Sequence, residues 1–319
     1  MKVVSVINYK GGVGKTTLTA NLGAYAASQG KRVLMIDLDP QTHLTFSFMT
    51  PEYWGRHYAD TKTLKNYFER VTRDDDDLLP LSELIIPLRP GSTLDYDYDN
   101  MKLDLVSSHL ELINIDIELS ALMSAPTTLM VASRFLKGYS YLRKELEKLE
   151  DEYDLVLLDC PPNFYVMVKN AIVASDYYIV PARPDYLSTL GVSELKKKID
   201  AHLTEYEEHA RQYNKAVEDN RMKKYKSIFL TLLGIVPMMV NIQKGDNPVS
   251  VQQEYINIMS SDGSHIFHFV RNNPSVFGSA PQDGIPAVLT RPRFNLTAKR
   301  IVKELRLLGD EILSSIYKD

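Results

Sequence analysis

Short apolar runs alternate with helical patterns along this chain. Each run is continuously apolar, which is typical of strands that are covered on both faces, as in a parallel sheet. The first helix is predicted from residue 15 to about residue 29, and Gly30 ends it. The repeated strand–helix–strand order predicts an α/β fold with a single doubly wound, mostly parallel sheet. The predicted strands are residues 3–7, 33–36, 103–106, 155–158, 177–180 and 228–236.

Two stretches interrupt this order. Residues 49–100 combine Trp54, several prolines and two acidic runs, at 74–77 and 95–99, with a short helix predicted over residues 63–71. Residues 200–226 are charged and helix-prone. We therefore expect one domain over residues 1–319 with helical insertions at about 49–100 and 200–226. The acidic runs are typical of solvated surface, and we assign no function to residues 74–77.

The last predicted helix is amphipathic. At 100° per residue, Lys299, Lys303 and Arg306 lie opposite an apolar stripe. This pattern predicts a helix packed on the sheet rather than one that lies on a membrane, which would place basic residues beside bulky apolar ones. The stripe consists of Ile301, Leu305, Leu308, Ile312 and Ile316.

Composition narrows the function classes. The chain has 319 residues, is 44% hydrophobic and carries a formal net charge of −4, which argues against a globally basic nucleic-acid coat. Its one cysteine, Cys160, excludes an intramolecular disulfide and is expected to be a packing residue. The apolar segment at the N-terminus is too short to be a signal peptide, and no apolar run reaches the 18 residues expected of a membrane-spanning helix. We expect a cytoplasmic protein.

A glycine-rich loop follows the first predicted strand and precedes the first helix. Glycines let backbone N–H groups approach phosphate oxygens, and the start of the helix adds its positive dipole end. Lys15 places a cation on the β- and γ-phosphates, and the Thr16 hydroxyl suits Mg²⁺. The loop is therefore predicted to bind a nucleoside triphosphate with Mg²⁺. The predicted cradle consists of Lys10, Gly11, Gly12, Val13, Gly14, Lys15, Thr16 and Thr17.

This loop departs from the general G-x-x-x-x-G-K-[ST] pattern, because Tyr9 stands where the first glycine would be and a second lysine, Lys10, precedes the glycines. The form K-G-G-x-G-K-[ST] resembles the deviant Walker A motif of the ParA/MinD family, and most closely its ParA-type partition ATPases. The resemblance implies that Lys10 reaches the nucleotide of a partner subunit in an ATP-sandwiched dimer. A solvent-facing loop residue is the alternative.

Carboxylates follow two predicted strands. Asp37 and Asp39 end the second strand, where α/β sheets bind ligands, although Pro40 indicates that the chain turns away there. The resemblance implies that Asp39 orients the attacking water and that Asp37 supports it. Both carboxylates are also candidates to hold Mg²⁺, directly or through water. Asp159 ends another apolar strand in a Walker B form, near Mg²⁺ through water. Surface turn residues are the alternative for the first pair.

The resemblance covers about two-thirds of the chain and implies contacts to adenine from Asn241 and the Pro281 backbone. Either is equally well explained as an ordinary loop residue. The sequence begins at the first predicted strand, so we expect no N-terminal helix-turn-helix domain and no operator binding.

By resemblance, the first hypothesis is an ATPase that hydrolyses ATP slowly, forms an ATP-bound homodimer, binds nonspecific DNA on the nucleoid and responds to a stimulating ParB-like adaptor. Its task would be to segregate a plasmid or chromosome, or to position a protein cargo. The alternatives are a MinD-like membrane-associated ATPase, which the C-terminal pattern disfavours, and a P-loop enzyme of small-molecule chemistry. The candidate DNA contacts are Arg271, Lys299, Arg300, Lys303 and Arg306, with Arg291, Arg293 and a second cluster at Lys223, Lys224 and Lys226.

Overall fold

The structure is a computed structural model that describes residues 1–72, 79–89, 101–122, 128–217, 224–243, 246–278, 284–290, 292 and 295–318. Its centre is a seven-stranded sheet with the strand order β3-β4-β2-β5-β1-β6-β7. Every neighbouring pair is parallel except β3 and β4, so the predicted doubly wound, mostly parallel sheet is confirmed. The strands are β1 (Lys2–Val6), β2 (Val33–Asp37), β3 (Ile86–Pro87), β4 (Leu103–Val106), β5 (Leu155–Asp159), β6 (Tyr177–Ala182) and β7 (Thr231–Pro237).

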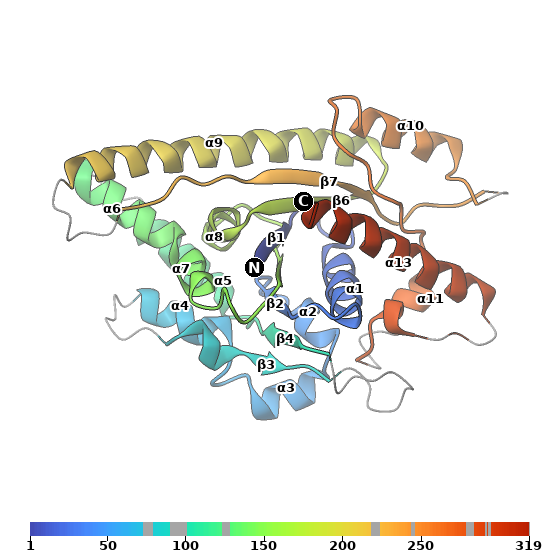
Figure 1. Cartoon of the computed structure of the whole chain (residues 1–319), viewed down its shortest axis with the longest axis horizontal. Helices are drawn as coiled ribbons and strands as arrows, with labels where there is room; N and C mark the ends of the chain where they lie inside the picture. The colour runs from blue at the N-terminus through green and yellow to red at the C-terminus, as the bar shows by residue number, and fades with distance from the viewer. Residues whose placement is uncertain are drawn as a thin grey trace.

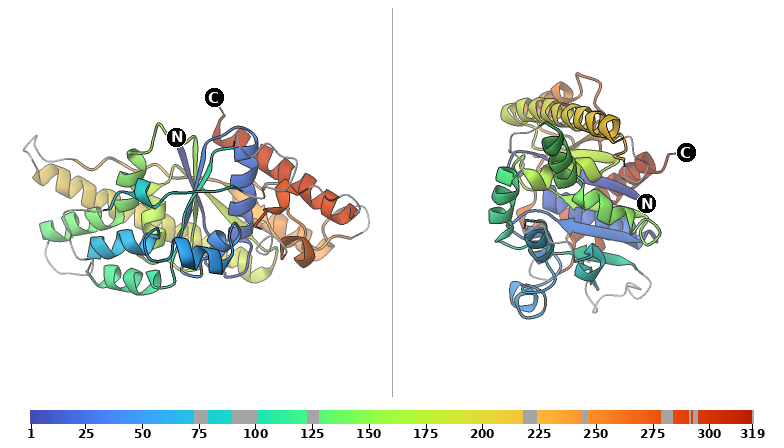
Figure 2. Two further views of the ribbon diagram at one scale, coloured as in Figure 1. Left: turned by 90° about the horizontal axis from the view of Figure 1, so that it is seen from below. Right: turned by 90° about the vertical axis from the view of Figure 1, so that its left-hand side faces the viewer.

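Helices cover both faces of the sheet (Figures 1 and 2). One face carries α1 (Lys15–Ser28), α13 (Leu296–Ile316) and the short η3 (Ala287–Leu289). The hydroxyl of Tyr25 on α1 donates to Asp310 of α13 at 2.6 Å. Gly309 lies against the Tyr25 ring, where a larger side chain would meet it. The two helices therefore pack directly against each other.

The other face carries a larger helical layer that includes α9, a 31-residue helix running along one side of the molecule (Figure 1). Apolar side chains of this layer and of the sheet form a second core. Its helices are α4 (Leu64–Thr72), α5 (Leu112–Leu122), α6 (Thr128–Tyr139), α7 (Tyr141–Glu147), α8 (Val166–Ala174) and α9 (Tyr186–Ala216). The remaining short elements are α2 (His43–Phe46), α3 (Pro51–His57), η1 (Leu81–Leu84), α10 (Ser250–Met259) and α11 (Pro274–Phe277).

Two sequence predictions of strands need correction. The predicted strand at 228–236 begins only at Thr231, because the Ile228 amide donates to Glu207 of α9 at 2.7 Å instead of pairing with β6. Strand β3 was not predicted; it is two residues long and includes Pro87, so it carries almost no periodic signal. It pairs antiparallel with β4 at the edge of the sheet.

The two interrupting stretches take different forms. Within the described part of residues 49–100 lie α3, α4, η1 and β3, and the predicted helix at 63–71 is found as α4. Residues 200–216 continue α9 without a break. The acidic runs at 74–77 and 95–99 lie outside the described residues.

The predicted apolar stripe of the last helix is confirmed. All five of its side chains are at most 4% exposed, and they pack in the core shared with α1. In the described part of the chain, we find no helix whose length and apolar character would suit a membrane crossing.

Candidate functional site

The loop between β1 and α1 has the backbone shape of a phosphate cradle. Gly12 and Gly14 have φ values of 69° and 91°, in the left-handed region that glycine adopts without strain. Gly14 caps α1 and offers no side-chain hydrogen bond to it. The N–H groups of the first turn are therefore available to an anion.

A cavity of about 450 Å³ opens above this loop. Gly11 and Gly12 are exposed to it, and a Cβ atom on either would meet no other atom within 4 Å. The space is large enough for phosphate groups to approach the backbone. The lining residues are Gly11, Gly12, Gly14, Lys15, Thr16, Thr17, Ala20, Asn21, Asp39, Gln41, His43, Phe46, Ser47, Pro162, Met239, Phe277 and Pro286.

Lys15 lies inside the cradle. Its side chain is 6% exposed, and its ammonium donates to the backbone carbonyl of Lys10 at 3.3 Å. Burial lowers the pKa of Lys15, while the negative charges of Asp159 and Asp39 oppose that shift. A phosphate in the cavity would supply the further negative charge that a buried ammonium requires.

The ends of β1, β2 and β5 bring two of the predicted carboxylates together. Asp37 and Asp159 are register partners on β2 and β5. Asp159 accepts hydrogen bonds from the hydroxyls of Thr16 at 2.7 Å and Thr19 at 3.1 Å. Burial raises the pKa of Asp159 to about 7, although the bonds from both threonines and the charge of Lys15 oppose the shift. A cation beside this carboxylate would favour its ionised form.

Asp37 and Asp39 occupy different positions. Asp37 is fully buried and accepts from the backbone N–H and the hydroxyl of Thr45 at 2.9 and 2.8 Å. Burial and the nearby Asp159 raise the pKa of Asp37. Asp39 lines the cavity and accepts from the Gln41 amide at 3.0 Å. Of the two, only Asp39 has direct access to a molecule in the cavity.

The oxygen groups around Thr16 fit Mg²⁺, which prefers hydroxyl, carboxylate, phosphate and water ligands. Within the described ranges, no three histidine, cysteine or acidic side chains are grouped so that they could hold a metal. Magnesium here would therefore depend on nucleotide phosphates and water, with Thr16 as a direct ligand and Asp39 and Asp159 as supporting groups. Bound in this way, it would neutralise the phosphate charge that develops during hydrolysis.

The Lys10 ammonium makes its contacts outside the group formed by Lys15, Thr16 and Asp159. Its ammonium donates to both carboxylate oxygens of Asp185, at 2.8 and 3.1 Å, and to the Ser188 hydroxyl at 3.1 Å. Asp185 also caps α9 by accepting from the Ser188 amide. Burial raises the pKa of Asp185, but the bonds from Lys10 and Ser188 outweigh it and hold this pKa below its ordinary value.

The sequence did not assign a role to Asp185. Its signal was available, because an aspartate after Pro184 and before a helical run is typical of an N-cap. No sequence pattern indicates that the start of α9 lies beside the cradle, because Asp185 is 175 positions from Lys10 along the chain.

Neither proposed adenine contact is found in the cavity lining among the described residues. Asn241 is exposed and is not among the cavity lining; its backbone N–H donates to Gln252 at 2.7 Å. Pro281 lies outside the described residues. The sequence missed Met239, which has a left-handed φ of 57°, and Phe277 of α11, both of which line the cavity. Phe277 offers an aromatic face suited to a base.

The proposed DNA contacts fall into two groups. Lys299, Arg300 and Lys303 are exposed on α13, although Arg300 is also 3.1 Å from Asp246. Arg271 is only 11% exposed and donates through Nε to Glu304 at 2.8 Å. Its charge is already paired, so Arg271 is not an accessible phosphate contact.

The other candidates are less well placed. Arg306 is half-buried and donates to the Val288 carbonyl at 3.4 Å. Lys224 and Lys226 are exposed at the far end of α9. Arg291, Arg293 and Lys223 lie outside the described residues.

Comparison with known proteins identifies a family and several relatives of this chain. The AAA_31 family model, described as an AAA domain, matches residues 1–211. Protein MJECL24 of Methanocaldococcus jannaschii is 27% identical over 86% of this chain and 94% of its own. The sporulation initiation inhibitor protein Soj of Bacillus subtilis is 32% identical over 61% of this chain and 63% of its own, just under two thirds of its length.

Among solved structures, apo McdA from Cyanothece superposes with a TM-score of 0.66. The match covers 98% of this chain and 99% of that one at 18% identity. At this level of identity the likeness establishes a shared fold.

Proposed function

Because the chain belongs to the ParA/MinD-type P-loop ATPases, we propose that it hydrolyses ATP as an ATP-dependent homodimer that binds nonspecific DNA. In this proposal the protein works in the cytoplasm on the nucleoid, where it segregates a plasmid or chromosome or positions a protein cargo. A ParB-like adaptor stimulates its slow hydrolysis.

The observation that carries this proposal is the position of Lys10. Its ammonium lies on the outer side of the cradle, where it is held by Asp185 and Ser188 rather than by the groups that surround Lys15. The Lys10–Asp185 pair is more than one-third exposed on both sides, so a partner's phosphates compete for Lys10 at little cost. We assign Lys10 to the nucleotide of the second subunit.

The surroundings of Lys10 support a self-association face. Tyr186, Leu187 and Leu190 at the start of α9 are 61%, 68% and 50% exposed, and Tyr165 in the loop after β5 is 55% exposed. Exposed large apolar side chains close together mark protein interfaces. A second copy placed there would bury them and bring its Lys10 toward this cavity.

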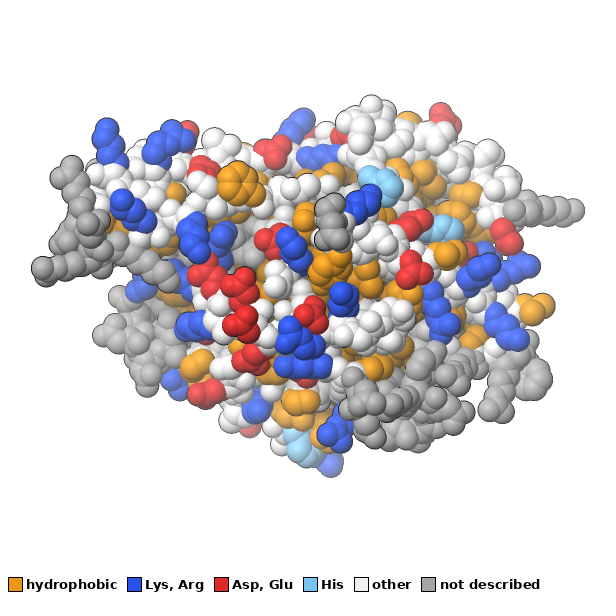
Figure 3. Space-filling view, in the orientation of Figure 1, with side chains coloured by type: hydrophobic (Ala, Val, Ile, Leu, Met, Phe, Trp, Pro, Cys, Tyr) orange, Lys and Arg blue, Asp and Glu red, His pale blue; other side chains and the backbone are white. Residues whose placement is uncertain are grey.

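The α13 surface supports DNA binding. Lys299 and Lys303 stand one turn apart and are exposed, and Figure 3 shows basic side chains gathered over this helix. Phosphate contacts from two subunits would add together, and the release of counterions would make binding strongly salt-dependent.

The burial of the α13 stripe disfavours a MinD-like membrane role for this helix. A membrane-binding helix must expose its apolar side chains to lipid, whereas these side chains pack against α1 and the sheet.

The proposal is tested by light scattering and DNA retention on the same protein. We expect a monomer without nucleotide or with ADP, a dimer with ATP and magnesium, and retention on duplex DNA only by the dimer. Retention should fall steeply as salt rises. A protein that remains monomeric with ATP would refute the dimer.

A matched pair of variants tests the DNA surface. Lys299→Glu with Lys303→Glu should weaken retention about tenfold or more while ATP affinity stays unchanged. The control, Lys197→Glu with Lys215→Glu, makes the same charge change on exposed positions of α9. Equal retention by both double variants would show that DNA binds elsewhere.

A further inference from the structure

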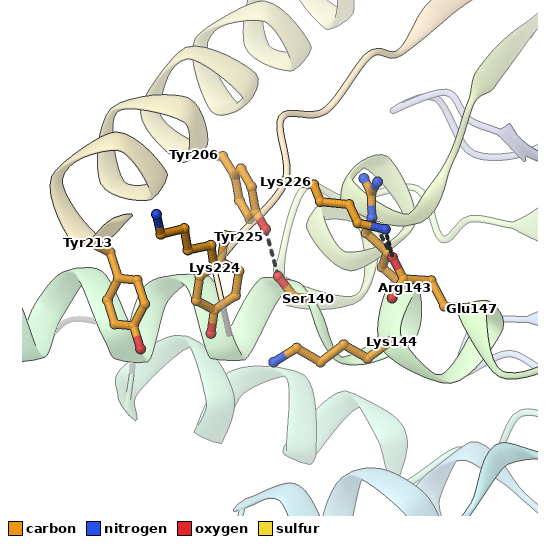
Figure 4. A pocket seen from close by; sticks show the side chains of 9 residues that line it. All are labelled: Ser140, Arg143, Lys144, Glu147, Tyr206, Tyr213, Lys224, Tyr225 and Lys226. Atoms are coloured by element: carbon orange, nitrogen blue, oxygen red, sulfur yellow. Dashed lines mark hydrogen bonds and ion pairs between the residues drawn. The ribbon is translucent and has the colours of Figure 1, made fainter. Parts of the chain in front are cut away.

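A second pocket lies at the far end of α9 from the cradle, between α7, the last turns of α9 and residues 224–226 (Figure 4). Its volume is about 240 Å³, and it shares no lining residue with the nucleotide cavity. ATP binding therefore does not account for it. The lining residues are Ser140, Arg143, Lys144, Glu147, Tyr206, Tyr213, Lys224, Tyr225 and Lys226.

Three tyrosines form an aromatic wall. The Tyr206 hydroxyl is hydrogen-bonded to that of Ser140 at 2.8 Å. The rings of Tyr213 and Tyr225 meet edge to face with their centroids 5.3 Å apart. The side chain of Asn214 bonds both the N–H and the carbonyl of Tyr225, at 3.0 and 2.8 Å. The wall is therefore built before any ligand arrives.

The rim of the pocket is strongly basic. The lining contains four basic side chains, Arg143, Lys144, Lys224 and Lys226, and one carboxylate, Glu147, a net charge of +3. The whole chain has a net charge of −4, so this is a local reversal of sign. Glu147 lies 3.6 Å from Arg143 and 3.8 Å from Lys226 and offsets only part of the charge.

The size of the pocket limits its occupant. Sites for whole small molecules are about 300–1,000 Å³, so a space of about 240 Å³ is better matched to one large side chain. An aromatic side chain would pack against the tyrosine rings, as anchor residues do at the centres of protein interfaces.

We propose that this pocket binds an acidic peptide segment of a partner protein, with one aromatic anchor in the tyrosine-walled cavity and acidic neighbours on Lys224, Lys226 and the basic side chains of α7. The inference goes beyond the proposed function, because neither ATP hydrolysis nor DNA binding requires this pocket.

Charge and shape favour a peptide over nucleic acid. The basic groups lie around one partly open pocket rather than forming a stripe that could follow a phosphate backbone. Glu147, at the rim, would repel phosphates, whereas a peptide can place a neutral or donor group beside it.

The pocket and the nucleotide site share one rigid element. Tyr206 lies on the helix that Asp185 begins, roughly 30 Å away along its axis. A peptide bound here would therefore touch the helix whose N-cap residue, Asp185, holds Lys10 in the free subunit.

The test uses the full chain and an array of short synthetic peptides. The central residue is tryptophan, leucine or alanine, and the flanks are glutamate, serine or lysine. We expect the strongest binding with a tryptophan centre and glutamate flanks, about tenfold weaker binding with an alanine centre, and none with lysine flanks. Binding of the best peptide is then measured by fluorescence anisotropy at two salt concentrations and should weaken at the higher one.

Two variants and one control locate the site. Lys224→Glu with Lys226→Glu, and separately Tyr213→Ala, should each weaken the best peptide about tenfold. Lys215→Glu, an exposed change on α9 outside the pocket lining, should leave affinity within about twofold. Thermal melting confirms that each variant is folded.

Three results would overturn the proposal. The first is no preference for acidic over basic flanks, and the second is equal affinity of the Lys224/Lys226 variant and the wild type for the best peptide. The third is a single-stranded or duplex oligonucleotide that displaces the peptide and binds more weakly to the same variant. The last result would reassign the pocket to nucleic acid.

Discussion

The inner and outer halves of the phosphate cradle are built from different kinds of contact. In the inner half, Lys15, Thr16 and Asp159 are buried or half-buried and bond to groups of the same chain. In the outer half, Lys10 makes an exposed ion pair with Asp185, next to apolar side chains that face solvent.

This difference shows which steps one subunit can perform alone. The inner half has its charges and hydrogen bonds in place, so one chain should bind ATP with magnesium. The outer half holds its lysine by a bond that a stronger anion can replace, because exposed ion pairs contribute little. The outer half therefore requires the surface of a second subunit to complete its contacts. The following predictions test this division, from the largest expected effect to the smallest.

Lys15→Ala should abolish ATP binding. Removing a buried ammonium that contacts phosphate is expected to weaken binding at least about 100-fold, or about 3 kcal/mol. Calorimetric titration with ATP and magnesium measures it. Lys31→Ala, just beyond the other end of α1, is the control and should bind normally; unchanged affinity in Lys15→Ala would remove the cradle assignment.

Asp39→Ala should keep ATP-dependent dimers but reduce turnover about 100-fold or more, because loss of a group that orients the attacking water removes catalysis without removing phosphate contacts. Phosphate release and light scattering on one sample measure the two properties. A monomeric variant with normal turnover would contradict the role of Asp39.

Lys10→Ala should separate the two halves. ATP affinity of the monomer should change less than about threefold, whereas the dimer should become about tenfold weaker or more, since only the partner's nucleotide loses a contact. Sedimentation at several protein concentrations with ATP measures the dimer. Lys62→Ala, which is outside the cavity lining, serves as control; a large loss of monomer affinity would place Lys10 in the inner half.

Asp116 provides a separate test outside the cradle, of folding stability rather than of nucleotide binding. It is 3% exposed and accepts from the Met167 amide at 3.0 Å, and burial raises its pKa from 3.8 to about 6. Since the folded state binds this proton more tightly, the stability that Asp116 contributes is full below pH 3.8 and is lost as pH rises through 6.

The variant Asp116→Asn lacks this titration. Relative to the wild type, its free energy of unfolding should therefore improve by about 3 kcal/mol between acid pH and pH 8, a change that urea denaturation measures. ATP and magnesium should not alter this difference, because Asp116 is not among the cavity lining. A pH-independent difference would show that its pKa is ordinary.

Much of the sheet could be predicted because its strands are continuously apolar and its glycines stand where the chain turns. The sequence predictions for β1, β2, β4, β5 and β6 differ from the structure by two residues or fewer at each end. Prediction was wrong for the start of β7 and missed β3, where a long-range bond to Glu207 and pairing at a sheet edge decide the structure.

The candidate site divides in the same way. The sequence alone determined the composition of the inner half, because glycines, Lys15 and Thr16 are adjacent in the chain and each aspartate directly follows an apolar strand. The spacing of residues along the chain is sufficient to predict such a site, because the phosphate groups bind to the backbone amides of neighbouring residues.

Only the tertiary structure decided which side chain holds Lys10, that Arg271 is neutralised by Glu304, and that Tyr206, Tyr213 and Tyr225 surround a basic pocket with α7. The two ion pairs join residues that are 175 and 33 positions apart, and the pocket joins α7, α9 and residues 224–226. Ion pairing and burial depend on distance in space, and periodicity along a chain carries no information about the packing that sets that distance.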